Sequence, residues 1–132
     1  MTDQIEVTLT TLLQSHDHVE AAWLFGSVAQ KAADRESDLD VAVLGTEPLS
    51  AHEKMKLIEE LAQATGRAVD LVDLQATRGP IVDRILHDGV RLFCDDTALY
   101  AELMKRGWFD RADWRPYRRR ILKERRERWI ES

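Results

Sequence analysis

Residues 21–45 read AAWLFGSVAQKAADRESDLDVAVLG, and this stretch decides the fold. The apolar run 21–25 has the length of a buried strand and stops at Gly26, and the run 39–44 has strand length too. Between the two runs, residues 27–33 suit a short helix that begins at the serine after the glycine. The stretch therefore predicts a strand, a Gly-Ser turn, a short helix and a second strand that opens with paired acids.

The rest of the chain continues this alternation of helix and strand. Hydrophobic periodicity and helix-capping residues predict the remaining elements. They are helices over 3–15, 50–66, 80–87 and 95–106, strands over 69–74 and 90–94, and a last helix that begins at Asp110 or Asp113. The expected fold class is α/β (α+β), with a small mixed sheet of about four strands flanked by helices and a C-terminal helical pair. We expect one domain over 1–132, with a core over about 1–96 and a helical extension over 97–132.

Composition excludes several classes of protein. A chain of 132 residues is long enough for one hydrophobic core, and no apolar run approaches the roughly 20 residues that cross a bilayer. The first fifteen residues lack the basic and apolar regions of a secretory signal, so a cytoplasmic location is expected. Cys94 is the single cysteine, which excludes an internal disulfide and fits a reducing compartment. The four histidines lack the spacing of a zinc site.

Charge is distributed unevenly along the chain. Residues 1–104 hold 8 Lys and Arg against 19 Asp and Glu, a net charge of −11, whereas residues 105–132 hold 11 against 5, a net charge of +6. An acidic body repels a phosphate backbone, so nucleic acid is not the expected partner of residues 1–104. The basic segment also carries aromatic residues. It is either an amphipathic helix packed on the domain or a helix that docks a protein or RNA partner.

The second apolar run begins with two acids, Asp38 and Asp40, separated by one residue. Because side chains alternate along a strand, both carboxylates point to the same side of the sheet. Such a pair suits two Mg²⁺ ions about 3.5–4 Å apart, which clamp the attacking and leaving oxygens of a phosphoryl displacement. Asp70 on the strand 69–74 is the expected third carboxylate, whereas Asp73 has the wrong parity.

Gly26 and Ser27 lie where an apolar strand gives way to a helix. Free backbone N–H groups at a helix start bind phosphate, and glycine permits a close approach of the backbone. These two residues are therefore the expected site for a nucleoside triphosphate. Lys31 either adds a positive charge to that site or is a solvent-exposed helix lysine.

These motifs resemble a known family. Gly26-Ser27, followed after ten residues by Asp38-Leu39-Asp40, is similar to the signature of the polymerase-β nucleotidyltransferase superfamily. The strand Val69–Leu74 and the segment ILHDGVRLF over 85–93 further resemble the minimal nucleotidyltransferases, and among them the antitoxins paired with HEPN ribonuclease toxins. The resemblance covers about residues 20–96.

The resemblance implies a function and a role for each motif residue. Such an antitoxin transfers AMP from ATP to a tyrosine of its toxin, which silences RNA cleavage. Gly26 and Ser27 would bind the β and γ phosphates, Asp38 and Asp40 would hold both Mg²⁺ ions, and Asp70 would bind the catalytic metal and help deprotonate the tyrosine. A homo- or hetero-oligomer would form through the C-terminal helices.

Two other functions stay open from the sequence. The first is a nucleotidyltransferase that modifies a small molecule of the aminoglycoside type, although a short chain leaves little room for a separate acceptor-binding domain. The second is a non-catalytic module that neutralises its partner by binding alone. Retention of all three candidate carboxylates favours the enzyme.

Overall fold

The structure, a computed structural model, describes residues 2–26 and 38–106. In chain order these residues form α1 (Thr2–Gln14), β1 (Ala21–Phe25), β2 (Leu39–Leu44), α3 (Ala51–Thr65), β3 (Val69–Asp73), α4 (Pro80–Asp88) and β4 (Val90–Cys94). A further helix covers residues 97–106. All the expected strands, and the expected helices that fall on these residues, are confirmed to within about three residues at each end. The expected short helix over 27–33 and the last helix of the C-terminal pair lie outside the described residues.

The four strands form one mixed sheet in the order β3-β2-β1-β4, as the fold class predicted. β1 pairs antiparallel with both β2 and β4, and β2 pairs parallel with β3. All five residues of β1 are buried, which is the pattern of a central strand covered on both faces. The sheet therefore has two faces to cover, and the end of β1 lies beside the beginning of β2.

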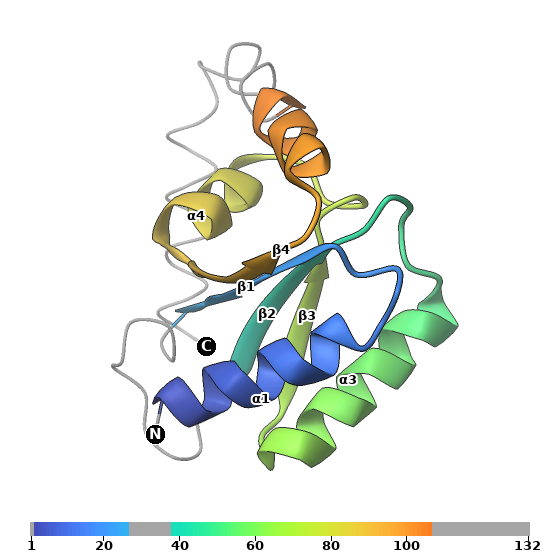
Figure 1. The fold of residues 1–132 in the computed structure, drawn as a ribbon, viewed down its shortest axis with the longest axis vertical. Helices are drawn as coiled ribbons and strands as arrows, with labels where there is room; N and C mark the ends of the chain where they lie inside the picture. The colour runs from blue at the N-terminus through green and yellow to red at the C-terminus, as the bar shows by residue number, and fades with distance from the viewer. Residues whose placement is uncertain (1, 27–37, 107–132) are drawn as a thin grey trace.

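Helices cover both faces of the sheet (Figure 1). α1 and α3 lie side by side on one face, and α4 and the helix over 97–106 lie on the other. The first core packs leucines of α1 and α3 on alternate strand residues: Leu9, Leu13, Leu24, Leu39, Val41, Leu57, Leu61 and Leu71 are among its members. The second core includes Trp23, Phe25, Ala42, Leu44, Val82, Ile85, Leu99 and Leu103. The helix over 97–106 thus supplies two leucines to the second core.

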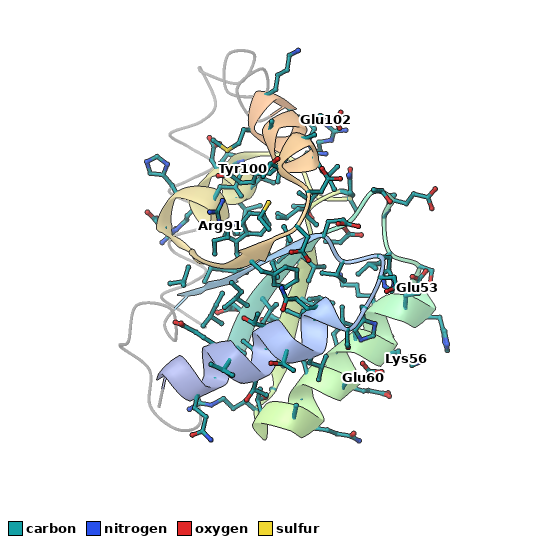
Figure 2. The ribbon with its side chains drawn as sticks, in the orientation of Figure 1. Glu53, Lys56, Glu60, Arg91, Tyr100 and Glu102 are labelled. Atoms are coloured by element: carbon teal, nitrogen blue, oxygen red, sulfur yellow. The ribbon has the colours of Figure 1, made fainter. Side chains whose placement is uncertain are left out.

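Local sequence explains where α3 begins and ends. Ser50 and Glu53 form a capping box, in which the Ser50 hydroxyl accepts from the Glu53 N–H at 3.1 Å and the Ser50 N–H donates to the Glu53 carboxylate at 3.3 Å. Gly66 ends the helix with φ +70°, a left-handed conformation that favours glycine. Glu53 and Lys56 of α3 are exposed, whereas Glu60 is partly buried and lies 2.7 Å from His16 Nε2 in the turn after α1 (Figure 2).

An aromatic contact joins the helix over 97–106 to the sheet. The Tyr100 ring stacks on the Trp23 ring of β1 with centroids 5.8 Å apart. The Arg91 guanidinium of β4 lies 5.7 Å from the Tyr100 ring centre, and the two side chains point toward one another in Figure 2. In the described parts of the chain, no helix is long and apolar enough to cross a membrane.

Candidate active site

Two of the predicted catalytic acids lie side by side at one end of the sheet. Asp40 on β2 is the partner of Asp70 on the parallel strand β3, and of Phe25 on β1. Neighbouring strands lie about 4.8 Å apart, and partner residues point to the same face. The two carboxylates therefore project together on the face that α4 covers, where Phe25 and Val72 enter the second core.

Asp38 completes the acidic group from just outside β2. It lies two residues before Asp40, and its negative charge acts on the Asp40 carboxyl. Its side chain is exposed, whereas that of Asp40 is partly buried. Asp38 and Asp70 therefore face solvent, whereas the Asp40 carboxylate is partly buried between neighbouring strands.

The surroundings of Asp40 make its ionised form unfavourable in the absence of a cation. Burial, followed by the negative charges of Asp70 and then Asp38, together raise the pKa of the Asp40 carboxyl to about 6. A carboxylate that loses hydration and gains like-charged neighbours is stabilised by a bound cation. The electrostatics of this end of the sheet therefore favour a cation site.

A magnesium ion fits this donor set when a triphosphate supplies the remaining ligands. Across residues 2–26 and 38–106, no group of three or more His, Cys, Asp or Glu side chains is arranged to hold a metal by itself. Mg²⁺ is commonly bound through one or two carboxylates together with substrate phosphates and water, so a magnesium site here does not require three protein ligands. The number of ions, and Asp38, Asp40 and Asp70 as their ligands, stay predictions.

Gly26 borders the carboxylates at the end of β1. It follows Phe25 directly, and its φ of +77° is the left-handed conformation in which glycine is favoured. The register of β1 with β2 places it next to the residue pair formed by Phe25 and Asp40. Ser27, the second predicted phosphate ligand, and Lys31 lie outside the described residues.

Asp73 lies on the opposite face of the sheet from Asp70, as its parity predicted. It is 5% exposed, and its two carboxylate oxygens accept from the Leu49 N–H at 2.7 Å and the Gln75 N–H at 3.0 Å. This acid therefore ties the end of β3 to the segment before α3. Its structural role was missed from the sequence, where the only signal was an acid at an apolar strand position.

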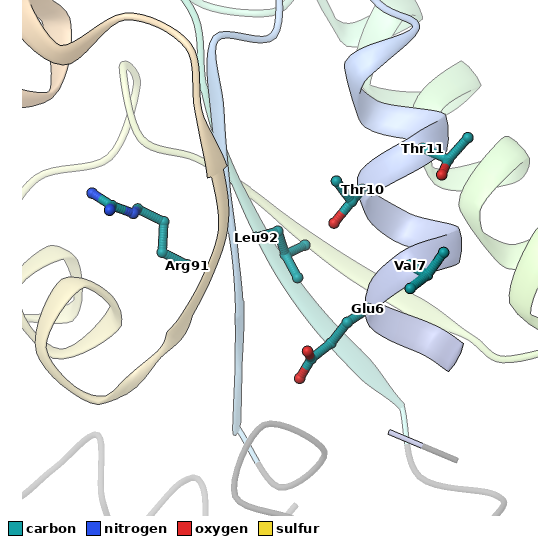
Figure 3. A pocket seen from close by; sticks show the side chains of 6 residues that line it. All are labelled: Glu6, Val7, Thr10, Thr11, Arg91 and Leu92. Carbon is teal, nitrogen blue, oxygen red and sulfur yellow. The ribbon is translucent and has the colours of Figure 1, made fainter. Parts of the chain in front are cut away.

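A groove lies at the other edge of the sheet, away from these acids. It has a volume of about 350 Å³ and lies between α1 and the edge strand β4 (Figure 3). Its lining consists of Glu6, Val7, Thr10, Thr11, Arg91 and Leu92. None of the predicted site residues lines this groove. We locate the candidate active site at the carboxylates, because paired acids beside a glycine turn have a defined chemistry.

Comparisons with known proteins identify the family. The family Polymerase beta, Nucleotidyltransferase matches residues 8–98, more than half of the chain. This range contains Gly26, Ser27 and all three candidate carboxylates. The chain therefore belongs to the polymerase β nucleotidyltransferase family, as the resemblance of its motifs implied.

One curated relative is a protein adenylyltransferase. The protein adenylyltransferase MntA of Shewanella oneidensis is 33% identical over 75 residues, which are 57% of this chain and 54% of MntA. The matched segment thus spans about half the length of this curated relative.

Solved structures extend the similarity over most of the chain. A crystal structure of a toxin–antitoxin with AMP-PNP is similar with a TM-score of 0.72 and 26% identity, over 89% of this chain and 98% of that one. A structure of a tri-AMPylated Shewanella oneidensis HEPN toxin in complex with MNT antitoxin is similar with a TM-score of 0.69 and 23% identity, over 92% and 99% of the two chains. The latter supports the fold alone.

Proposed function

We propose that this chain is a Mg²⁺-dependent protein adenylyltransferase that acts as an antitoxin. It transfers AMP from ATP to a tyrosine of a partner toxin of the HEPN ribonuclease family and so neutralises it. The observation that carries the proposal is the pairing of Asp40 with Asp70 beside Gly26, in a chain of the nucleotidyltransferase family.

Two relatives support the choice of nucleotide and acceptor. MntA, which shares 33% identity with the matched segment, is a protein adenylyltransferase. The similar toxin–antitoxin structure contains AMP-PNP, a non-hydrolysable analogue of ATP.

The residues of the site divide the reaction between them. Gly26 and Ser27 bind the β and γ phosphates through backbone N–H groups, and Asp38 and Asp40 hold the Mg²⁺ ions. The tyrosine oxygen forms a bond to the α-phosphorus while the bond from that phosphorus to the bridging oxygen breaks, and pyrophosphate leaves. Mg²⁺, when bound by these acids, would neutralise phosphate charge and favour loss of the phenolic proton.

Asp70 would bind the catalytic metal and help to remove the phenolic proton. A tyrosine has an unperturbed pKa of about 10, so it needs a neighbouring base or cation to lose its proton at neutral pH. The Asp70 side chain is exposed and shares its face with Asp40, so it can take the proton and pass it to solvent. The need for ATP agrees with the expected cytoplasmic location.

The basic segment is the proposed docking element for the toxin. Its Trp114, Tyr117, Ile121 and Trp129 are residue types enriched at binding hot spots, and its arginines complement an acidic partner. This segment lies outside the described residues, so the proposal rests on its sequence. The C-terminal helices expected from the sequence would also support a homo- or hetero-oligomer.

The test is a transfer assay with the product of the neighbouring gene as the candidate partner. Wild-type protein, labelled ATP and Mg²⁺ are incubated with that partner, and the partner is analysed by intact mass and tyrosine mapping. We expect a gain of one or more AMP units on tyrosine, lost in the Asp38→Asn/Asp40→Asn double variant. Asp17→Asn, a change at an exposed acid in the turn after α1, is the matched control and keeps the activity.

The other outcomes separate the remaining functions. Neutralisation of the partner by the double variant, with no adduct in the wild type, would show a non-catalytic antitoxin. Labelling of an aminoglycoside in place of the partner would show a small-molecule nucleotidyltransferase.

A further inference from the structure

Gly26 has no room for a side chain, and the group that occupies the space is the Asp40 carboxylate. A Cβ placed on Gly26 would lie 2.2 Å from Asp40 Oδ2 and 3.1 Å from Asp40 Cγ. Contacts below about 3 Å are repulsive for non-bonded heavy atoms, so a methyl group and this carboxylate cannot both keep their positions. Any larger residue at position 26 forces one of them to move.

Asp40 can relieve such a clash only by turning its carboxylate. Its backbone is held on both sides, by Phe25 of β1 and by Asp70 of β3. The Asp40 Cβ would lie 3.4 Å from the added methyl, an ordinary contact, so the strain falls on the carboxylate group beyond it. Rotation of that group moves its oxygens away from the face shared with Asp70.

We propose that Gly26 is a positioning residue for Asp40: its missing side chain keeps the Asp40 carboxylate beside Asp70, independently of any contact that the Gly26 backbone makes with phosphate. The inference rests on the proposed function, in which Asp40 is a metal ligand. It differs from a role in phosphate binding alone, because it predicts an effect on the metal site when no nucleotide is present.

Gly66 provides a matched control for backbone strain. Its φ is +70°, close to the +77° of Gly26, but a Cβ placed on Gly66 would meet no atom within 4 Å. Gly66→Ala therefore carries the cost of a left-handed alanine without a clash, whereas Gly26→Ala carries both.

The first measurement is the weak binding of Mn²⁺ to the carboxylates of the nucleotide-free protein, titrated with excess Mn²⁺ and followed by electron paramagnetic resonance. We expect Gly26→Ala to weaken the affinity about tenfold or more, the range typical for loss of a group that orients a metal ligand. Gly66→Ala should stay within about twofold of wild type on the same argument. If Gly26→Ala keeps the wild-type Mn²⁺ affinity and loses only ATP binding, the proposal is overturned.

The second measurement is a double-mutant cycle on unfolding by urea. Asp40→Ala removes the oxygens and Cγ that the added methyl would meet, so Gly26→Ala should be far less destabilising in that background. We expect the cost of Gly26→Ala on the unfolding equilibrium constant to fall about tenfold there, toward that of Gly66→Ala. Equal costs in both backgrounds would contradict a steric cause, whatever the Mn²⁺ result.

The cycle also decides the case in which Gly26→Ala alone does not fold. Recovery of folding in Gly26→Ala/Asp40→Ala would support the proposal, and failure of both variants to fold would oppose it. Failure of this proposal can be told apart from failure of the proposed function. If the wild type binds Mn²⁺ through this arrangement but transfers no AMP to its partner, the positioning role stands and the proposed antitoxin activity is wrong.

Discussion

The two ends of the sheet surround a partly or fully buried carboxylate with groups of opposite electrostatic character. At one end, Asp40 has like-charged neighbours, and burial together with these neighbours raises its pKa to about 6. At the other end, Asp73 is almost fully buried but accepts two backbone N–H groups, from Leu49 and Gln75. The comparison teaches that the same residue type serves stability where backbone donors surround it, and is available for binding where other acids surround it.

Asp70 and Asp73 are close in sequence but lie in these two different surroundings. They lie three residues apart on β3 and point to opposite faces. Asp70 is exposed beside Asp40, whereas Asp73 is tied to the segment before α3. Mutations near Asp40 should therefore affect activity, whereas mutations near Asp73 should affect stability.

Substitution at the acidic end should have the largest effect, and it should fall on activity. Asp40→Asn should lower kcat/KM for AMP transfer about a thousandfold, equivalent to about 4 kcal/mol in transition-state stabilisation, because the cation site loses its central carboxylate. Steady-state kinetics with a labelled nucleotide measure the change. Retention of more than about a tenth of the wild-type value would remove Asp40 from the catalytic site.

Substitution at the other end should affect stability instead. Asp73→Ala leaves the Leu49 and Gln75 N–H groups buried without acceptors, and should lower the free energy of unfolding by about 3 kcal/mol. Asp70→Ala, at an exposed position of the same strand, should change it by less than about 0.5 kcal/mol. Urea denaturation compares the two. Similar losses of unfolding free energy for both variants would contradict the proposed difference between the two ends of the sheet.

Acid pH should stabilise the metal-free protein through Asp40. The folded-state pKa of this carboxyl, about 6, lies above its unfolded value. Its stabilising contribution is therefore fully present below about pH 4 and is lost as the pH rises through 6. Because Asp40 is partly exposed and solvent screens its neighbours, we expect only about 1 kcal/mol of unfolding free energy to be lost between pH 5 and 7.

Urea titrations in EDTA at several pH values measure this effect. Asp40→Asn is the control, since it removes the titrating group and should flatten the profile over that range. Added Mg²⁺ should stabilise the wild type at pH 7 more than this variant, because a ligand that binds only the folded state raises its stability. A wild-type profile that coincides with that of Asp40→Asn would contradict the assignment.

The smallest effect is expected next to the segment that Asp73 anchors. Ser50→Ala removes the hydroxyl that caps α3 and should cost about 0.5–1 kcal/mol of unfolding free energy without changing AMP transfer. Ser50→Thr keeps the hydroxyl and should recover most of the loss. Thermal unfolding reports the stability, and a parallel transfer assay reports the activity. A fall in transfer would mean that the two ends of the sheet are coupled.

The sequence by itself determined the elements and the side of the sheet on which each acid lies. Alternation along β2 and β3 was sufficient to group Asp38, Asp40 and Asp70 and to exclude Asp73, because side-chain direction in a strand depends only on parity. The capping residues Ser50 and Gly66 located α3 for a similarly local reason. The motif of Gly26 and the acids also indicated the family.

Only the tertiary structure decided which atoms meet. The pairing of Asp40 with Asp70, and the contact that excludes a side chain at Gly26, depend on the register between strands that are distant in sequence. The Leu49 N–H that donates to Asp73 comes from the segment before α3, 24 residues away in sequence, so no local pattern revealed it. Hydrophobic alternation specifies a face of a strand, whereas register and the packing of helices specify the neighbours on that face.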